Sequence, residues 1–211
     1  MTSSDPAAVL GVVMAAGYSR RFGAEDKRMA YWPITGRTLL GETLHQLQQA
    51  LANLVVVIRP EDSPQALGIP GACQIIHAPH AAQGLGASIA DALDVIQRSG
   101  QWQQSHSLAL MLGDMPTLQP ASVRQLLPYA SEKQIVRPIY QGQPGHPVVF
   151  GRDYWPALQQ LSADNGARQV LQHHQQQVRR VAVADPGVVH DIDTAAALTA
   201  AFTAENPAPR S

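Results

Sequence analysis

Short apolar runs alternate along the chain with longer segments in which apolar residues recur every three or four positions. The short runs suit buried strands, and the longer segments suit helices with one buried face. This alternation favours a mainly parallel sheet with helices on both faces. We expect strands at Val9–Met14, Leu54–Ile58, Gln74–His77, Leu108–Leu112, Ile135–Pro138, Val148–Phe150 and Val178–Val183. We expect helices at Thr38–Leu51, Ala87–Arg98, Pro120–Leu127, Asp153–Leu161, Gly166–His173 and Thr194–Ala204.

Composition places the chain among globular proteins. Of its 211 residues, 45% are hydrophobic and 15% charged, and the formal net charge is −1. One α/β domain spanning residues 1–211, with a core at about 9–204 and frayed ends, accounts for this length. The chain has no block rich in Lys and Arg, which argues against a nucleic-acid partner.

The cysteine content and the lengths of the apolar runs exclude further classes of protein. The single cysteine, Cys73, leaves no internal disulfide framework and no multi-cysteine zinc site. No apolar run approaches the roughly 18 residues of a membrane span, and the N-terminus lacks a leader pattern. We therefore expect a cytoplasmic protein with no membrane partner.

The first apolar run leads into a loop that is typical of nucleotide binding. Val9–Met14 is followed by Ala15-Ala16-Gly17 and a basic stretch that ends at Lys27. Small residues let successive backbone N–H groups approach an anion, and Arg21 and Lys27 add positive charge for a polyphosphate. The stretch lacks both the P-loop and the G-x-G-x-x-G patterns. The alternative is a strand and turn with incidental basic residues.

A second candidate segment, Gly113-Asp114-Met115-Pro116, follows the strand expected at Leu108–Leu112. Because ligands gather at the carboxyl ends of parallel strands, we expect Asp114 to face the same crevice as the first loop. A carboxylate there suits Mg²⁺, which binds one or two carboxylates together with substrate phosphates. The alternative role for Asp114 is to cap the turn or the next helix.

Glycines and a serine mark the start of the helix expected at Ala87–Arg98. Gly84, Gly86 and Ser88 follow the strand Gln74–His77. They make backbone amides available to a base edge or an anion, although a plain turn with a helix cap explains them almost as well.

Two further polar residues lie in motifs near the middle of the second half. His146 precedes a short strand, and Arg168 lies in the first turn of a helix that Asp164 or Asn165 could cap. His146 could be a polar loop residue, and Arg168 could bind either a substrate phosphate or an adjacent carboxylate.

Two acidic residues follow at Asp191 and Asp193, where the pattern indicates a strand end before a helix at Thr194. If Asp191 lies near Asp114, the two carboxylates could hold one Mg²⁺. Otherwise Asp193 or Thr194 serves as a helix N-cap.

In this order, the segments resemble the molybdenum cofactor cytidylyltransferase family. The resemblance spans about Val9 to Leu198 and rests on A-A-G-x-S-x-R-F-G…K, G-D-M-P, G-H-P-V-V-F, D-N-G-A-R and D-I-D-T. It implies a three-layer α/β/α fold with a Rossmann-like nucleotidyltransferase sheet. It further implies Mg²⁺-dependent transfer of CMP from CTP to the terminal phosphate of molybdopterin, with release of pyrophosphate. A molybdoenzyme that receives the product is a further implied partner.

The resemblance also implies residue roles. Nucleotide binding falls to Ala15, Ala16, Gly17, Ser19, Arg21, Lys27, Gly84, Gly86 and Ser88. Catalysis falls to Lys27, Arg21 and Asp114, and Mg²⁺ binding to Asp114, Asp191 and Asp193. His146 and Arg168 would line the side that the acceptor enters.

Some positions depart from the family pattern or leave alternatives open. Met14-Ala15-Ala16-Gly17 fits CTP, whereas relatives that use GTP usually have Leu-Ala-Gly-Gly. Glu25 and Asp26 precede Lys27, and Arg28-Met29-Ala30-Tyr31-Trp32 follows where the family often has a Leu-Leu or Met-Leu pair. Tyr31 and Trp32 would alter the acceptor pocket.

Three alternative functions remain at this point. The first is guanylyl or other nucleotidyl transfer to a different phosphorylated acceptor. The second is an NAD(P)- or flavin-dependent redox enzyme, which the missing G-x-G-x-x-G disfavours. The third is a non-catalytic protein that binds or delivers the cofactor.

Overall fold

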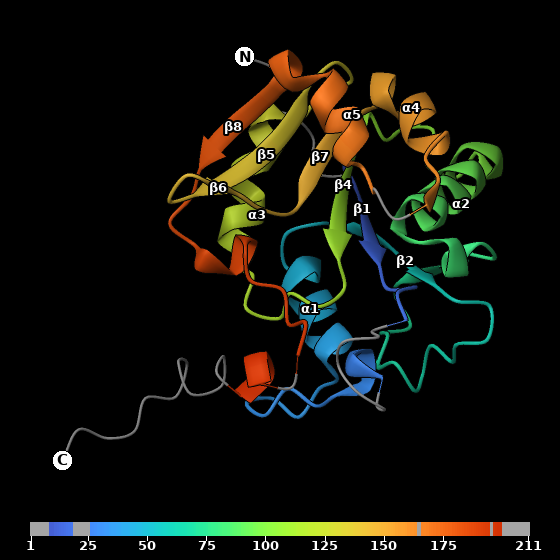
Figure 1. Ribbon diagram of the computed structural model, residues 1–211, viewed down its shortest axis with the longest axis vertical. Helices are drawn as coiled ribbons and strands as arrows, with labels where there is room; N and C mark the ends of the chain where they lie inside the picture. Colours follow the sequence, from blue (N-terminus) through green and yellow to red (C-terminus); the bar gives the residue numbers. More distant parts are fainter. Residues whose placement is uncertain (1–8, 19–25, 164–165, 195, 200–211) are drawn as a thin grey trace.

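The chain folds around one mixed sheet, shown in Figure 1 as a computed structural model that describes residues 9–18, 26–163, 166–194 and 196–199. The parallel half of the sheet contains β1 (Val9–Met14), β2 (Asn53–Ile58), β3 (Gln74–His77) and β4 (Ser107–Leu112), adjacent in the order β3-β2-β1-β4. These strands are almost continuous apolar runs because helices cover both of their faces. β1 is central, and its end lies level with the end of β4.

The other half of the sheet contains β7 (Val148–Gly151), β5 (Ile135–Tyr140), β6 (Gln143–Pro144) and β8 (Val178–Ala182). β7 pairs antiparallel with both β4 and β5, so β5 runs in the same direction as β4. β8 then pairs parallel with β5. All described strands except β6 and β7 therefore run in one direction, which confirms the expected mainly parallel sheet.

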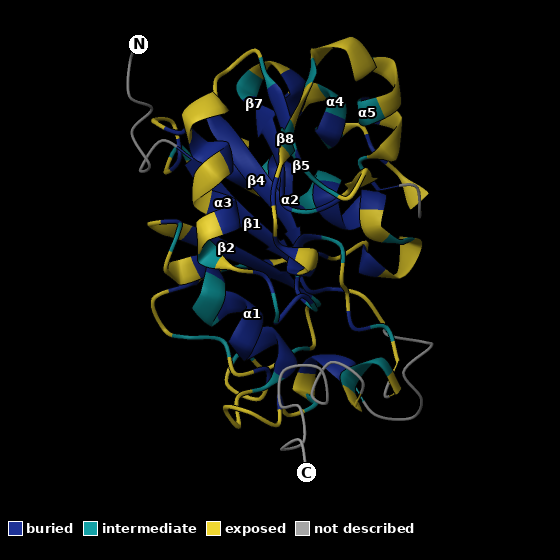
Figure 2. Ribbon diagram, turned by 90° about the vertical axis from the view of Figure 1, so that its left-hand side faces the viewer, coloured by how far each residue is buried: buried dark blue, intermediate teal, exposed yellow. Residues whose placement is uncertain are grey.

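Helices on the two faces of the sheet complete three layers (Figures 1 and 2). α1 (Leu39–Gln48) and α3 (Pro120–Leu126) pack on one face, whereas α2 (Leu85–Ser99), α4 (Trp155–Gln159) and α5 (Arg168–His173) pack on the other. Side chains alternate along β1 to supply both cores, since Val13 belongs to the first and Val12 to the second. Among the described helices, none has the length and apolar content needed to cross a bilayer.

Six single 3₁₀ turns also lie within the described residues. They are η2 (Lys27–Met29), η3 (Ala81–Gln83), η4 (Leu127–Tyr129), η5 (Arg152–Tyr154), η7 (Gln175–Gln177) and η8 (Pro186–Val188).

Several elements differ locally from expectation. The helix expected at Asp153–Leu161 divides into η5 and α4, with Pro156 in the first turn of α4, where proline is favoured. The expected strand end before Asp191 is wrong: the chain passes from η8 into an irregular segment. The last expected helix is present at residues 196–199, and most of its remainder lies outside the described residues.

A test of the packing at the end of β7 is the substitution Gly151→Ala. A Cβ atom there would overlap the backbone carbonyl oxygens of Ser131 and Glu132, which cannot rotate away. We expect the free energy of unfolding, measured by urea denaturation, to fall by about 2–3 kcal/mol. Gly71→Ala is the matched control, because its Cβ would meet nothing within 4 Å. Equal stability of the two variants would contradict this account.

Candidate active site

A cavity of about 590 Å³ opens at the carboxyl ends of β1 and β4. Its lining combines the loop after β1, the start of η2, the start of α2 and the segment after β4. The lining residues are Met14, Ala15, Ala16, Gly17, Tyr18, Lys27, Arg28, Ala81, Ala82, Gly84, Leu85, Ser88, Leu112, Gly113, Asp114 and Asp193. Residues that are distant in the sequence thus form one site at the edge where parallel strands end.

Backbone contacts hold the ends of β1, β2 and β4 together. Gly113 N–H donates to the carbonyl oxygen of Met14 at 3.0 Å, and Ala15 N–H donates to that of Val57 at 2.8 Å. A Cβ atom on Gly113 would lie 3.2 Å from the Cβ of Ala15, so glycine permits this close approach. Asp114 consequently emerges beside the small-residue loop.

Lys27 projects from η2 into the acidic side of the cavity. Its Nζ donates to Asp114 Oδ2 at 2.5 Å and to Asp193 Oδ1 at 2.8 Å. Burial by itself lowers the pKa of Lys27, but the attraction of Asp114 and Asp193 outweighs it and raises the pKa above its usual value. Lys27 is therefore a fixed positive charge at neutral pH.

Asp114 is the most deeply buried carboxylate of the site. Its Oδ1 atom is inaccessible to solvent and has no hydrogen-bond partner in the part of the chain that the structure describes. Burial raises the pKa of this carboxyl group, against the opposing attraction of Lys27, and Asp191 and Asp193 raise it further. An orphaned buried carboxylate oxygen indicates room for a cationic partner.

Asp191 and Asp193 complete a group that could hold such a partner. Asp114, Asp191 and Asp193 each offer a carboxylate oxygen, and these oxygens lie within 4.8 Å of one another. Hard oxygen donors of this type suit Mg²⁺, so the residues present fit the ion that the sequence indicated.

The irregular segment that carries these two aspartates is anchored at Ile192. Its N–H donates to the carbonyl oxygen of Asp114 at 2.9 Å. Its side chain is buried with Trp32 and Leu39 in a small apolar cluster. Trp32, 2% exposed, is therefore a support for the acidic segment, and the expected effect of Tyr31 and Trp32 on the acceptor pocket stays a prediction.

The two glycines and the serine at the start of α2 have different structural roles. Gly84 lines the cavity and has φ 112°, a conformation that favours glycine. Gly86 is absent from the cavity lining, and a Cβ there would lie 2.7 Å from the carbonyl oxygen of Ala163 and 2.8 Å from that of Ser162. Ser88 lines the cavity, and its Oγ donates to the carbonyl oxygen of Gly84 at 3.3 Å. Close packing thus accounts for Gly86.

His146 and Asp191 line a second cavity, of about 370 Å³. Leu112 borders both cavities, so they are neighbours. His146 is partly buried, and its Nδ1 atom is inaccessible to solvent and has no hydrogen-bond partner among the described residues. Burial, and then the positive charge of Arg137, lower the pKa of His146 to about 4, so the imidazole is neutral at physiological pH.

Among the described site residues, Arg168, like Gly86, is not brought into these cavities. Arg168 is exposed at the start of α5 and lines neither cavity. Ser19 and Arg21 lie outside the described residues. Their assigned roles stay predictions. Conversely, Tyr18 and Arg28 line the first cavity, although the sequence had not assigned them a role. Their positions next to Gly17 and Lys27 are the signal that could have indicated them.

Comparison with known proteins agrees with the chemistry of the cavity. The MobA-like NTP transferase domain matches residues 11–178. The chain is 26% identical to the molybdenum cofactor cytidylyltransferase of Escherichia coli strain K12 over 186 residues, which cover 87% of this chain and 90% of that protein. It is 28% identical to the purine catabolism protein PucB of Bacillus subtilis strain 168 over 201 residues, which cover 88% of this chain and 92% of that protein.

A solved structure gives the same result for the fold. The homologue of Mycobacterium tuberculosis Rv0371c from Mycobacterium sp. strain JC1 superposes with a TM-score of 0.79 at 28% identity, covering 94% of this chain and 96% of that chain. The domain match includes the loop after β1, Lys27 and Asp114, and it ends before Asp191. The chain belongs to the MobA-like NTP transferase family and is a nucleotidyltransferase.

Proposed function

We propose that this chain transfers the cytidylyl group of CTP to the terminal phosphate of a molybdopterin-type acceptor and releases pyrophosphate. The observation that carries the proposal is the cavity in which the small-residue loop, Lys27 and the carboxylates of Asp114 and Asp193 meet. Family membership supplies the reaction class. The similarity to the E. coli cytidylyltransferase supports the nucleotide and the acceptor.

The reaction needs no nucleophile from the protein. An oxygen of the acceptor phosphate forms a bond to the α-phosphorus of CTP, while the bond from that phosphorus to the bridging oxygen of pyrophosphate breaks. Catalysis then depends on holding the two substrates in line and on offsetting the charge that develops. The protein must therefore supply N–H donors and fixed charge at the phosphates.

The residues around the first cavity suit these tasks. The backbone of Ala15–Gly17 and the start of α2 at Gly84 would hold the nucleotide, because small residues allow a close approach to N–H groups. Lys27 would offer its fixed positive charge to the phosphates. The CTP assignment rests on Ala16, where guanylyl-transferring relatives usually have glycine.

Asp114, with Asp191 or Asp193, would hold Mg²⁺. When bound, this ion would supply positive charge to the α-phosphate and the departing pyrophosphate. The orphaned Oδ1 of Asp114 supports this assignment.

The second cavity is the proposed entrance for the acceptor. It borders the first at Leu112, and it contains the neutral imidazole of His146. A neutral imidazole can donate one hydrogen bond and accept another, which suits a polar heterocyclic acceptor better than a second cation would.

The proposal is tested by measuring pyrophosphate release with Mg²⁺ and molybdopterin, in its free and metal-loaded forms, in the presence of CTP, GTP or UTP. We expect release only when CTP and the acceptor are both present. Preference for GTP would overturn the choice of nucleotide but keep the reaction class. Activity confined to a sugar phosphate would overturn the acceptor, and a folded protein that is inactive in every combination would contradict the proposal.

We expect Asp114→Asn to lower turnover at least about a hundredfold, because one lost electrostatic contact to a phosphoryl transition state costs about 3 kcal/mol. The fold should be retained, since burial already disfavours the charged carboxylate. Steady-state kinetics and a melting curve check both statements. Asp91→Asn is the matched control, because Asp91 lies on α2, pairs with His80 before η3 and lines neither cavity. Turnover of Asp114→Asn equal to that of the control would exclude a catalytic carboxylate.

The neutral state of His146 predicts a pH dependence of stability. Between pH 6.5 and about 4 the unfolded chain binds a proton at His146 and the folded chain does not. The contribution of His146 to the free energy of unfolding is therefore complete above pH 6.5 and is lost as the pH falls. The loss amounts to about 3 kcal/mol.

Urea unfolding with a chelator present, at pH 7 and pH 4.5, should show this loss in the wild type. His146→Gln carries no titratable group at this position. Its free energy of unfolding should therefore fall much less between the two pH values, and most of the loss seen in the wild type should be absent. Parallel pH profiles for the two proteins would mean that His146 is not held neutral.

A further inference from the structure

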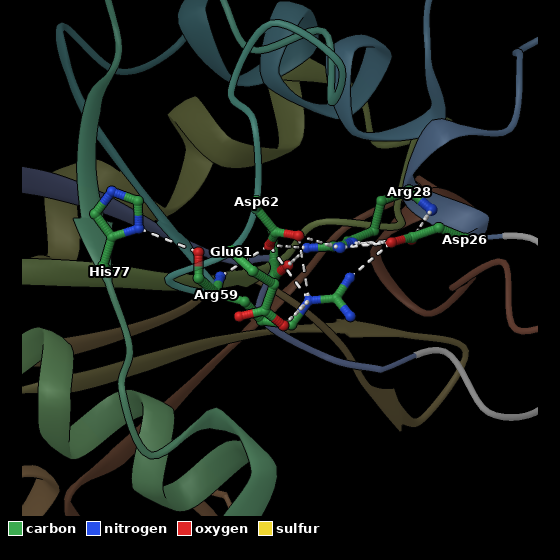
Figure 3. Close-up of polar contacts among 7 residues, drawn as sticks. Asp26, Arg28, Arg59, Glu61, Asp62 and His77 are labelled. Atoms are coloured by element: carbon green, nitrogen blue, oxygen red, sulfur yellow. Dashed lines mark hydrogen bonds and ion pairs between the residues drawn. The ribbon is translucent and has the colours of Figure 1, made fainter.

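Arg28 lies next to Lys27 in η2, yet its guanidinium group faces a different set of partners (Figure 3). The Arg28 side chain is 5% exposed. Nε donates to Asp26 at 2.9 Å, and Nη2 donates to Asp26 at 2.5 Å and to Asp62 at 2.8 Å. Nη1 donates at 2.6 Å both to Asp62 and to the carbonyl oxygen of Ala15. An arginine side chain has five N–H groups, and each of these has an acceptor.

These contacts join three separate segments at one point. Ala15 follows β1, Asp26 precedes η2, and Asp62 lies in the turn after β2. The carbonyl oxygen of Ala15 belongs to the same planar peptide as the N–H group of Ala16. By holding that oxygen, Arg28 fixes the direction of the Ala16 N–H group, which belongs to the proposed nucleotide loop. By holding Asp26, Arg28 also fixes the residue before Lys27.

Arg59 extends the same cluster toward the cavity wall. It donates to Asp26 at 2.6 Å and lies 3.3 Å from Asp62, so two arginines balance two aspartates. Its guanidinium carbon lies 4.7 Å from the ring centre of Tyr18, a residue that lines the cavity. The cluster therefore reaches the nucleotide loop at Ala15 and at Tyr18.

A direct phosphate contact or a purely stabilising role fits Arg28 less well. All its donors are already used, and its charge is neutralised by the neighbouring carboxylates. Buried ion pairs add little net stability compared with apolar packing of the same volume. The ionic cluster at this position therefore calls for a role other than stability.

We infer that Arg28 is a positioning residue for nucleotide binding. Through its contacts with Ala15 and Asp26, it fixes the residue before Ala16 and the residue before Lys27, so that the Ala16 N–H group and Lys27 keep their directions. The inference rests on the proposed function, because it takes this loop to be the place where the triphosphate binds.

The first test is Arg28→Lys, which keeps the charge but cannot span two carboxylates and a carbonyl oxygen with one nitrogen. We expect KM for the nucleoside triphosphate to rise about tenfold while kcat changes less than about threefold, because the loop holds the nucleotide in the ground state and the transition state alike.

The matched control is Arg152→Lys. Arg152 donates to the carbonyl oxygens of Trp102, Gln103 and Ser105, at the end of β4 opposite to Asp114. This variant should lose comparable thermal stability and leave KM unchanged. If Arg28→Lys lowers the melting temperature but keeps the wild-type KM, as the control does, the inference is wrong.

A second readout does not depend on the substrate. Hydrogen exchange of the free protein, followed by mass spectrometry, should be faster in Arg28→Lys for peptides that cover residues 15–18, and unchanged there in Arg152→Lys. A wild-type protein that is inactive with every nucleotide would overturn the proposed function, and the exchange data would still decide whether Arg28 orders the loop. Unchanged exchange at residues 15–18 would overturn the inference.

Asp62→Asn covers the case in which Arg28→Lys does not fold. It removes the carboxylate charge that both Nη atoms of Arg28 contact, so the guanidinium group is held less firmly against the carbonyl oxygen of Ala15. We expect a smaller rise in KM, about threefold, with faster exchange at residues 15–18. Wild-type values for both would overturn the inference.

Discussion

The parallel pairing of β1 with β4 is the constraint on which the rest of the site depends. The register runs from Val9 opposite Ser107 to Met14 opposite Leu112, so the two strands end at the same level. The loop after β1 and Asp114 then leave the sheet side by side, and Ile192 attaches the acidic segment to the Asp114 backbone. A shift of one residue in this register would turn the side chains of β1 to the opposite face and separate these groups.

Two adjacent basic residues show how the neighbouring groups decide the role of a buried charge. Lys27 and Arg28 both lie in one 3₁₀ turn and are both buried, but Lys27 meets the carboxylates at the cavity and Arg28 meets those of the neighbouring cluster. A lysine suits the first position because its ammonium group is a compact charge that can move to a phosphate. An arginine suits the second because its planar group has directional donors for several acceptors at once.

The sequence predicts the parallel strands and the edge at which the first cavity opens, because buried parallel strands are apolar runs and their ends share one edge. It predicts other features less well, because they depend on a weak turn signal or on contacts between distant segments. The β5–β6 hairpin depends on Gln141 and Gly142, which both adopt positive φ in a type I′ turn, a pattern that Gln-Gly signals only weakly. The packing of Trp32 on Ile192 and the pairing of Arg28 with Asp62 join residues far apart in the chain, so no local pattern reveals them.

The contact of Lys27 with Asp114 and Asp193 has a consequence for the protein before any substrate arrives. The ammonium group is tethered to the same chain, so its effective concentration at the carboxylates is far higher than that of an ion in solution. Lys27 thus acts as a counter-ion within the chain and offsets part of the repulsion among the clustered carboxylates. A triphosphate that attracted Lys27 would remove this counter-ion. The net charge at the acidic cluster would therefore depend on whether the nucleotide is bound.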